Sequence, residues 1–308
     1  MSVSAGSLQF GGASLLAALR KRLGSRAGAQ SVIPAAATTI AFLALFGEPL
    51  RLLVQDWWQL PEAGHGLLLA PAAAWLAWQK GVRPGAASNR VVGIAVLILA
   101  VLIRYMSGLA AELFTMRESI VLALAALTVY NYGVRQVLWW WLPFTLAVLA
   151  IPLPELLTQQ LALPLQFEAS RIGARLLSSR HVPVLLTGNV IRLPGRDLFV
   201  TEACSGLRSL TALLSLAVLM GGIWLKYPLS RLFLVAFALP IAILINGVRV
   251  FLTGFLVFFV SPSLGEGFMH LTEGWLLFLV SFVSLGLFAW TFVLAERQLA
   301  QWWRTRSA

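Results

Sequence analysis

Charged residues are scarce in this chain, and cysteine is almost absent. Only 11% of the 308 residues are charged, whereas a soluble domain carries about 25%. The single cysteine, Cys204, excludes an intrachain disulfide, and with three scattered histidines it makes a poor zinc site, so no metal or other cofactor is expected. In contrast, 59% of the residues are hydrophobic and long apolar runs recur. This composition excludes a soluble globule and predicts an all-α polytopic membrane protein.

Acidic residues are also few, with 12 against 23 basic residues and a formal net charge of +11. Nucleic-acid binders show such a balance, but these arginines gather at the ends of apolar runs, where they set topology and contact lipid headgroups. Membrane lipid is therefore an expected partner, and nucleic acid is not. The chain has no His-Glu-x-x-His motif, no Gly-x-Ser-x-Gly motif and no phosphate-binding glycine loop. Metalloprotease, serine hydrolase and nucleotide-driven functions thus lose their usual support.

The apolar runs predict the number and direction of the spans. A membrane-spanning helix needs about 20 apolar residues. About eight spans are predicted, at 33–52, 64–80, 91–110, 113–132, 136–152, 203–225, 230–260 and 270–295. Basic residues then place both termini in the cytoplasm. The expected order is a basic amphipathic tail at 1–31, helices 1–5 within 32–152, an extracytoplasmic segment at 153–202, helices 6–8 within 203–295 and a basic tail at 296–308.

The extracytoplasmic segment between helices 5 and 6 has two parts. Residues 155–179 carry apolar positions at helical spacing, which predicts a helix lying in the membrane interface. Residues 182–200 have short β-branched runs broken by Gly188-Asn189 and Pro194-Gly195, which predicts a small hairpin. The segment's arginines oppose the positive-inside rule, although long external segments count less in that rule. They are Arg171, Arg175, Arg180, Arg192 and Arg196.

Three reactive residues are predicted to share one depth. Cys204 and His270 fall at the outer starts of the sixth and eighth spans, and Arg249 follows Arg231 by 18 residues, which is about 27 Å of helix. A thiol, a guanidinium and an imidazole at one level suit a cysteine nucleophile site. Plainer interpretations exist, because a lone cysteine usually only packs and an interfacial histidine is common. An arginine inside an apolar span is by default functional or paired.

The residues next to Cys204 favour its thiolate. Thr201 as an N-cap would place Cys204 in the first turn of the sixth span, beside unpaired N–H groups that can also hold an oxyanion. Arg208 follows at i+4 on the same helix face. Glu202 and Ser205 flank the thiol on either side.

Other polar residues near the predicted site carry weaker signals. Asn246 lies one turn before Arg249 and can hydrogen-bond across helices. His65 falls at the same outer face, where an interfacial turn also explains it. Ion pairs inside the bundle are predicted between Arg117 and Glu118 and between Arg104 and Glu112.

Three blocks of the sequence surround the cysteine, the arginine and the histidine: Thr201-Glu202-Ala203-Cys204-Ser205-Gly206-Leu207-Arg208-Ser209-Leu210, Asn246-Gly247-Val248-Arg249-Val250 and Gly267-Phe268-Met269-His270. In this order they resemble the Cys, Arg and His signatures of the exosortase/archaeosortase transpeptidases. Upstream, Gly64-His65-Gly66, Ile151-Pro152-Leu153-Pro154 and Gly188-Asn189-Val190-Ile191-Arg192-Leu193-Pro194 are similar to further landmarks of that family. The resemblance covers roughly residues 60–295.

The resemblance implies a cysteine enzyme of the bacterial inner membrane that cleaves a C-terminal sorting signal on exported proteins. That signal is typically a Pro-Glu-Pro motif, a transmembrane helix and a basic tail. Cys204, Arg249 and His270 would be catalytic, with Arg208, Glu202, Ser205, Asn246 and His65 supporting them or binding substrate. A thioester on Cys204 would be resolved by an amine of unknown identity or by water. The alternative is a multispan transporter or an exopolysaccharide-export component without cysteine catalysis, although no internal repeat supports it.

Overall fold

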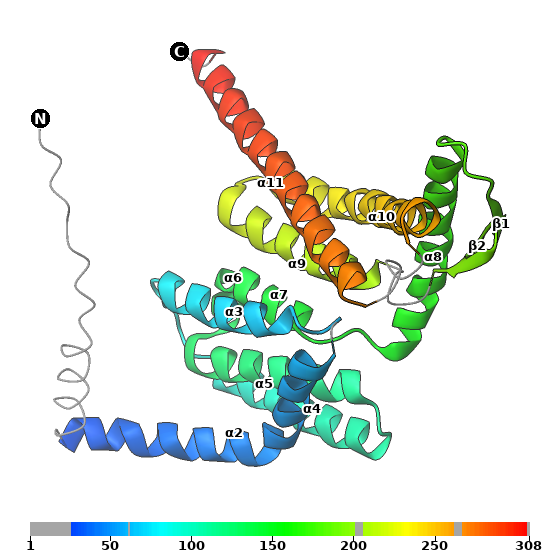
Figure 1. Cartoon of the computed structure of the whole chain (residues 1–308). Helices are drawn as coiled ribbons and strands as arrows, with labels where there is room; N and C mark the ends of the chain where they lie inside the picture. Colours follow the sequence, from blue (N-terminus) through cyan, green and yellow to red (C-terminus); the bar gives the residue numbers. More distant parts are fainter. Residues whose placement is uncertain (1–25, 61, 201–205, 262–266, 307–308) are drawn as a thin grey trace, which may run out of the picture. The chain divides into compact units, whose positions relative to one another are not determined.

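The computed structural model describes residues 26–60, 62–200, 206–261 and 267–306, without the side chains of 26–32 and 267–274. These residues form helices and one small sheet (Figure 1). The chain divides into two compact units, Met1–Arg51 and Leu52–Ala308. The first unit holds most of helix α2 (Arg26–Gln59), and every contact described below lies within the second.

In the second unit, successive helices are joined by short connections, and a small sheet lies between α8 and α9. After the end of α2 come α3 (Gly66–Lys80), α4 (Arg90–Leu109), α5 (Leu113–Tyr132), α6 (Val134–Trp139), α7 (Trp141–Leu149) and α8 (Glu155–Ser178). Strands β1 (Leu185–Thr187), β2 (Val190–Leu193) and β3 (Arg196–Phe199) follow. The chain ends with α9 (Leu207–Trp224), α10 (Pro228–Phe259) and α11 (Gly267–Arg306).

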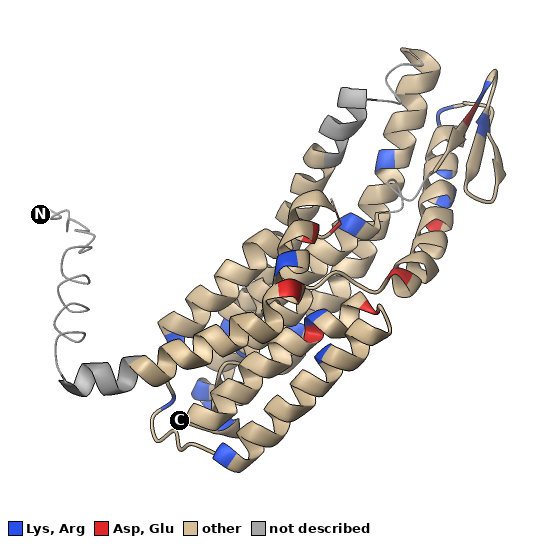
Figure 2. Cartoon of the chain, turned by 90° about the horizontal axis from the view of Figure 1, so that it is seen from below, with Lys and Arg blue, Asp and Glu red and all other residues tan. Residues whose placement is uncertain are grey.

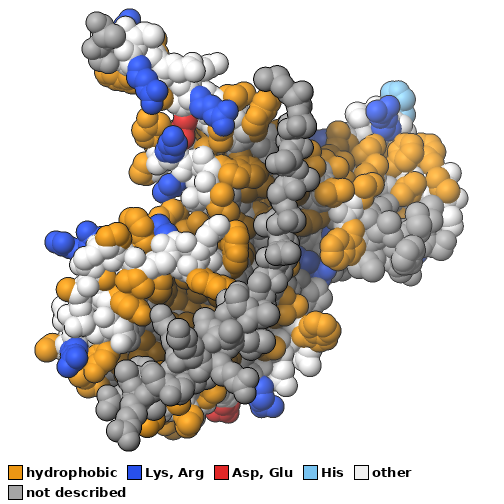
Figure 3. All heavy atoms as spheres, turned by 90° about the vertical axis from the view of Figure 1, so that its left-hand side faces the viewer, with side chains coloured by type: hydrophobic (Ala, Val, Ile, Leu, Met, Phe, Trp, Pro, Cys, Tyr) orange, Lys and Arg blue, Asp and Glu red, His pale blue; other side chains and the backbone are white. Residues whose placement is uncertain are grey.

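Six of the described helical segments are long and apolar enough to cross a membrane. They are Ile33–Gln59, Arg90–Leu109, Leu113–Tyr132, Leu207–Trp224, Pro228–Phe259 and Trp275–Arg306. Hydrophobic side chains are exposed over much of the face shown in Figure 3, as expected of helices that contact lipid tails. The prediction of an all-α multi-pass membrane protein is therefore confirmed.

The second and fifth predicted spans are shorter than the other six. Helix α3 has 15 residues, and the fifth span is divided into α6 and α7, of six and nine residues, at Trp140. Pro143 explains this break, because it has no N–H to bond the carbonyl of Trp139 four residues before it. Hydropathy measures composition alone and does not detect such an interruption.

Helices α9, α10 and α11 enclose the largest described core cluster. Its central side chains include Leu213, Ala217, Leu234, Ala238 and Leu285, all fully buried. Glu296 of α11 closes the cluster at one end by accepting hydrogen bonds from the backbone N–H groups of Lys226 (2.9 Å) and Tyr227 (3.1 Å). A carboxylate at the first turn of α10 also suits the positive end of that helix.

The second half of helix α8 packs on α10. Ile172 lies against Gly247, Gly173 against Val250 and Leu177 against Gly254. Because the partners rise together in number, the two helices run in the same direction through this contact. A Cβ on Gly173 would lie 2.5 Å from a Val250 methyl, so the close approach requires glycine there. A helix is thus present over 155–178, and its depth in the membrane stays a prediction.

The region predicted as a hairpin is a three-stranded antiparallel sheet, in the order β1-β2-β3. Ile191 pairs with Leu186 on one side and with Leu198 on the other. The second turn, at Pro194-Gly195, therefore starts a third strand that the two-strand prediction missed. Asn189 ties the sheet to α8 by donating to Gln166 Oε1 (3.1 Å) and to the carbonyl of Val200 (3.1 Å).

The topology prediction can be checked with reporter fusions after residues 85 and 190. A fusion after residue 85, between α3 and α4, should report a cytoplasmic location, and one after residue 190, in β2, an extracytoplasmic location, since the basic tails should share one side. A fusion at the last residue should also report a cytoplasmic location. Cytoplasmic signals after both 85 and 190 would contradict the assignment of 153–202 to the outside.

Candidate functional site

Helix α10, which is mostly apolar, carries two polar residues far from its start. Asn246 is buried, with 6% exposure, and Arg249 follows it by one turn and is half-buried. Arg249 lies 18 residues beyond Arg231 in the same continuous helix, which is about 27 Å. Removing two such side chains from water is costly. Polar residues in such positions are therefore usually paired with other groups or functional.

The start of α9 lies directly against Asn246. Gly206, the residue before α9, has a left-handed φ of +79°. A Cβ on it would lie 2.8 Å from Asn246 Cγ and 3.0 Å from Asn246 Nδ2. Only glycine meets both conditions without strain. The contact joins the Cys block to the Arg block of the sequence.

The helix start corrects one prediction about Cys204. Helix α9 begins at Leu207 with Gly206 as its cap, so Thr201 does not cap it and Cys204 precedes it by three residues. Gly206 causes the difference, because its left-handed backbone cannot continue a helix toward lower numbers. Glu202, Cys204 and Ser205 lie outside the described residues.

The described residue nearest to Cys204 along the chain is Gly206, which follows it by two positions in the sequence. Gly206 touches Asn246, one turn from Arg249. The position of the Cys204 thiol, and with it the common depth of Cys204 and Arg249, stays a prediction.

His270 and Arg208 complete the predicted set. His270 is the fourth residue of α11, and its side chain lies outside the described residues. Helix α11 packs on α9 and α10 through Phe278, Phe282 and Leu285. Arg208 is exposed on the first turn of α9. The meeting of His270 with Arg249 stays a prediction.

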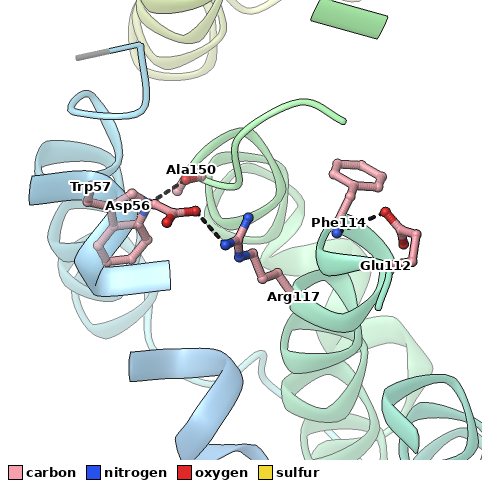
Figure 4. Close-up of polar contacts among 6 residues, drawn as sticks. All are labelled: Asp56, Trp57, Glu112, Phe114, Arg117 and Ala150. Atoms are coloured by element: carbon pink, nitrogen blue, oxygen red, sulfur yellow. Dashed lines mark hydrogen bonds and ion pairs between the residues drawn. The ribbon is translucent and has the colours of Figure 1, made fainter. Parts of the chain in front are cut away.

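A second polar cluster joins the end of α2 to α5 and α7 (Figure 4). Arg117 Nη2 lies 2.5 Å from Asp56 Oδ2, with side-chain exposures of 7% and 21%. Next to it, Trp57 Nε1 donates to the carbonyl of Ala150 at 2.6 Å. Pro154 makes this bond necessary, because it has no N–H to bond Ala150 four residues before it.

The ring of His65 contacts the backbone carbonyl of Leu149, the residue before Ala150. Its Nε2 lies 3.1 Å from the carbonyl of Leu149, so Nε2 carries the proton in this contact. The Gly64-His65-Gly66 and Ile151-Pro152-Leu153-Pro154 landmarks thus approach one another. For His65 the structure supports a role in packing α3 on α7.

The two predicted ion pairs differ from those observed. Arg117 pairs with Asp56 and not with Glu118, because adjacent helix residues point about 100° apart. Glu112 caps α5 by accepting from the N–H groups of Phe114 (3.0 Å) and Thr115 (2.7 Å). Burial alone would raise the pKa of Glu112, but these bonds and the Thr115 hydroxyl outweigh it and lower that pKa.

Comparison with models of protein families shows to which family the chain is related. A family model described as transmembrane exosortase matches residues 57–287, which is most of the chain. The protein belongs to the transmembrane exosortase family. The resemblance expected from the signature blocks is thereby confirmed. Comparisons with curated proteins and with solved structures give no match.

Sequence reasoning missed two features of this exosortase-family chain. Asp56 was overlooked as the partner of Arg117, although an acid at the end of an apolar run was a usable signal. Gly206 was read only as part of the Cys block, since a positive φ has no local signature beyond glycine itself. Among the residues that the structure describes, no three of His, Cys, Asp and Glu group as metal ligands would.

The contact at Gly206 can be measured against a matched glycine. Gly206→Ala should destabilise the protein more than Gly195→Ala, because Gly195 has a similar φ of +80° but no atom within 4 Å of an added Cβ. The shared φ penalty is about 1–2 kcal/mol, and the Asn246 contact should add roughly 1–3 kcal/mol. Unfolding in detergent measures both, and the double variant Gly206→Ala/Asn246→Ala should recover part of the loss. Equal costs at 206 and 195 would show that the contact is unimportant.

The Asp56–Arg117 pair yields a second stability prediction. Arg117→Met should cost about 3 kcal/mol, because it leaves the Asp56 carboxylate without its cation. Asp56→Asn/Arg117→Met should cost less, since no charge remains unpaired. Arg171→Met is the control, because its pair with Glu168 is exposed and worth about 0–1 kcal/mol. If Arg117→Met lowers the stability no more than Asp56→Asn/Arg117→Met does, the two charges are not electrostatically coupled.

Proposed function

We propose that this exosortase-family protein is a membrane cysteine transpeptidase or peptidase of the bacterial inner membrane, acting near the extracytoplasmic face. Its substrates would be exported proteins with a C-terminal sorting signal, of the Pro-Glu-Pro type followed by a transmembrane helix and a basic tail. The contact between Gly206 and Asn246 is the observation that best supports this, because it joins the Cys and Arg blocks in space. Family membership supports the same reaction class.

The proposed reaction has two steps at one carbonyl carbon. The Cys204 thiolate attacks the scissile carbonyl, the C–N bond breaks, and His270 gives a proton to the departing amine. The product is a thioester between Cys204 and the exported protein. An amine or a water molecule then attacks the thioester, His270 takes its proton, and the C–S bond breaks to restore the thiolate. Transpeptidation and hydrolysis differ only in that second nucleophile.

Arg249 supplies positive charge to this reaction. Its position one turn from Asn246, beside the start of α9, lets a guanidinium stabilise either the thiolate or the oxyanion through charge-assisted hydrogen bonds. Asn246 sets the approach of the Cys204 segment through Gly206. Arg208, Glu202 and Ser205 flank the thiol and would contact substrate, whereas His65 is committed to the Leu149 carbonyl.

Substitution of the nucleophile tests the proposal directly. Cys204→Ala and Cys204→Ser should each lower processing of a co-expressed substrate by at least about 10³-fold, because neither supplies a thiolate. Arg249→Lys should also fail, since a point-charge ammonium lacks the planar fork of donors. The readout is the size shift of the substrate, together with the unfolding midpoint of each variant.

Arg90→Lys is the matched control for Arg249→Lys. Arg90 is an exposed arginine at the start of α4, away from the proposed site, so the same change there should leave processing intact. Processing that persists in Cys204→Ala would refute cysteine catalysis. Normal activity of Arg249→Lys would reduce Arg249 to a general electrostatic role.

A further inference from the structure

The exposed face of α8 changes character halfway along the helix. Its first half presents large apolar side chains with at least 37% exposure, namely Leu156, Leu157, Leu161, Leu163 and Phe167. From Glu168 onward the exposed residues are polar or basic, with Arg171 and Arg175 on the helix and Arg180 and His181 just after its end. Figure 2 shows blue positions along this part of α8, beside the sheet. We name Arg171, Arg175, Arg180 and His181 the basic face.

The contacts with α10 give the depth of this change. Ile172 and Gly173 lie against Gly247 and Val250, so the basic face begins level with Arg249. That level is about 27 Å from Arg231, and the apolar core of a bilayer is about 30 Å thick. The apolar half of α8 directly follows the outer end of the fifth predicted span, so it lies along the outer interface next to the lipid tails, and the basic face begins at the depth of phosphates.

The charge on this face is only partly compensated within the protein. Arg171 pairs with Glu168 at 2.6 Å, and Arg192 on the neighbouring strand is 3.9 Å from Asp197. Among the described residues, Arg175 and Arg180 have no acidic partner. The negative end of α8 accounts for a cation in its last turn, where Arg175 lies. It does not account for Arg180 and His181, which follow the helix.

We propose that the basic face of α8 binds the phosphates of anionic lipid headgroups. Guanidinium groups form paired hydrogen bonds to phosphate oxygens, and an apolar surface directly below them on the same helix fits the acyl chains. A partner reached through water would not need that apolar half. The inference rests on the geometry of α8 and does not depend on the proposed enzymatic activity. It also gives Arg171, Arg175 and Arg180, three of the five arginines of 153–202, a reason to oppose the positive-inside rule.

Site-specific photo-crosslinking tests the proposal on the full chain. A photo-reactive amino acid replaces Ser178, an exposed residue at the end of α8, and the protein is placed in nanodiscs of phosphatidylcholine with a minority of phosphatidylglycerol. In one sample the phosphatidylcholine carries a detectable label, and in a second sample the phosphatidylglycerol carries it. Crosslinking should favour phosphatidylglycerol beyond its mole fraction, and Arg175→Gln/Arg180→Gln should lower that preference by about fivefold for each arginine until it is lost.

The control removes equal charge elsewhere. Arg304→Gln/Arg306→Gln, at the end of α11, should leave crosslinking at residue 178 unchanged. Raising the salt concentration on the wild-type protein should weaken the preference without any substitution. Equal labelling of both lipids by the wild-type protein would overturn the proposal. So would crosslinking to a co-expressed exported polypeptide in place of lipid, which would make this face a protein docking surface.

Discussion

One turn of α10, from Asn246 to Val250, is the point on which the surrounding structure depends. Gly206, at the start of α9, packs on Asn246. From another direction, Ile172 and Gly173 of α8 pack on Gly247 and Val250. The segment that joins α8 to α9, which includes the sheet, therefore connects two elements that both contact this turn of α10. Arg249 belongs to this turn, so its surroundings are set by both neighbours at once.

Polar groups within the bundle follow a second constraint, because lipid offers them no hydrogen bonds. The helical pattern ends after α7, so the carbonyl of Leu149 has no partner in the next turn, and Pro154 offers no N–H to the carbonyl of Ala150. The rings of His65 and Trp57 replace those partners. Asp56, next to Trp57, neutralises Arg117. The residues that look most reactive in this cluster are thus engaged in satisfying backbone and charge.

Features that depend on composition could be predicted from the sequence, whereas features that depend on partners far along the chain could not. Six apolar runs are long helices because apolar length alone determines them. The break at Trp140 follows from Pro143 and not from apolar length. The third strand is recognised only from the pairing of Ile191 with Leu198, which composition does not reveal. The partner of Arg117 is 61 positions away in the sequence, so the prediction chose the adjacent acid and was wrong.

The candidate site was predictable to a similar degree. Spacing along α10 placed Arg249 far from Arg231, and a continuous helix joins the two. The start of α9 was placed wrongly, because a capping pattern at Thr201 competes with a glycine whose φ only tertiary contact reveals.

This shift of the helix start changes the physical argument for the thiol. A cysteine that precedes the cap of α9 is not within the first helical turn, so it gains less from the N–H groups and the dipole of that helix. More of any thiolate stabilisation must then come from a cation. Arg249 is the half-buried candidate, one turn from the residue that Gly206 touches, and Arg208 is the exposed one. In the proposed mechanism, the charge of an arginine, and not the end of a helix, is therefore the main means of stabilising the Cys204 thiolate.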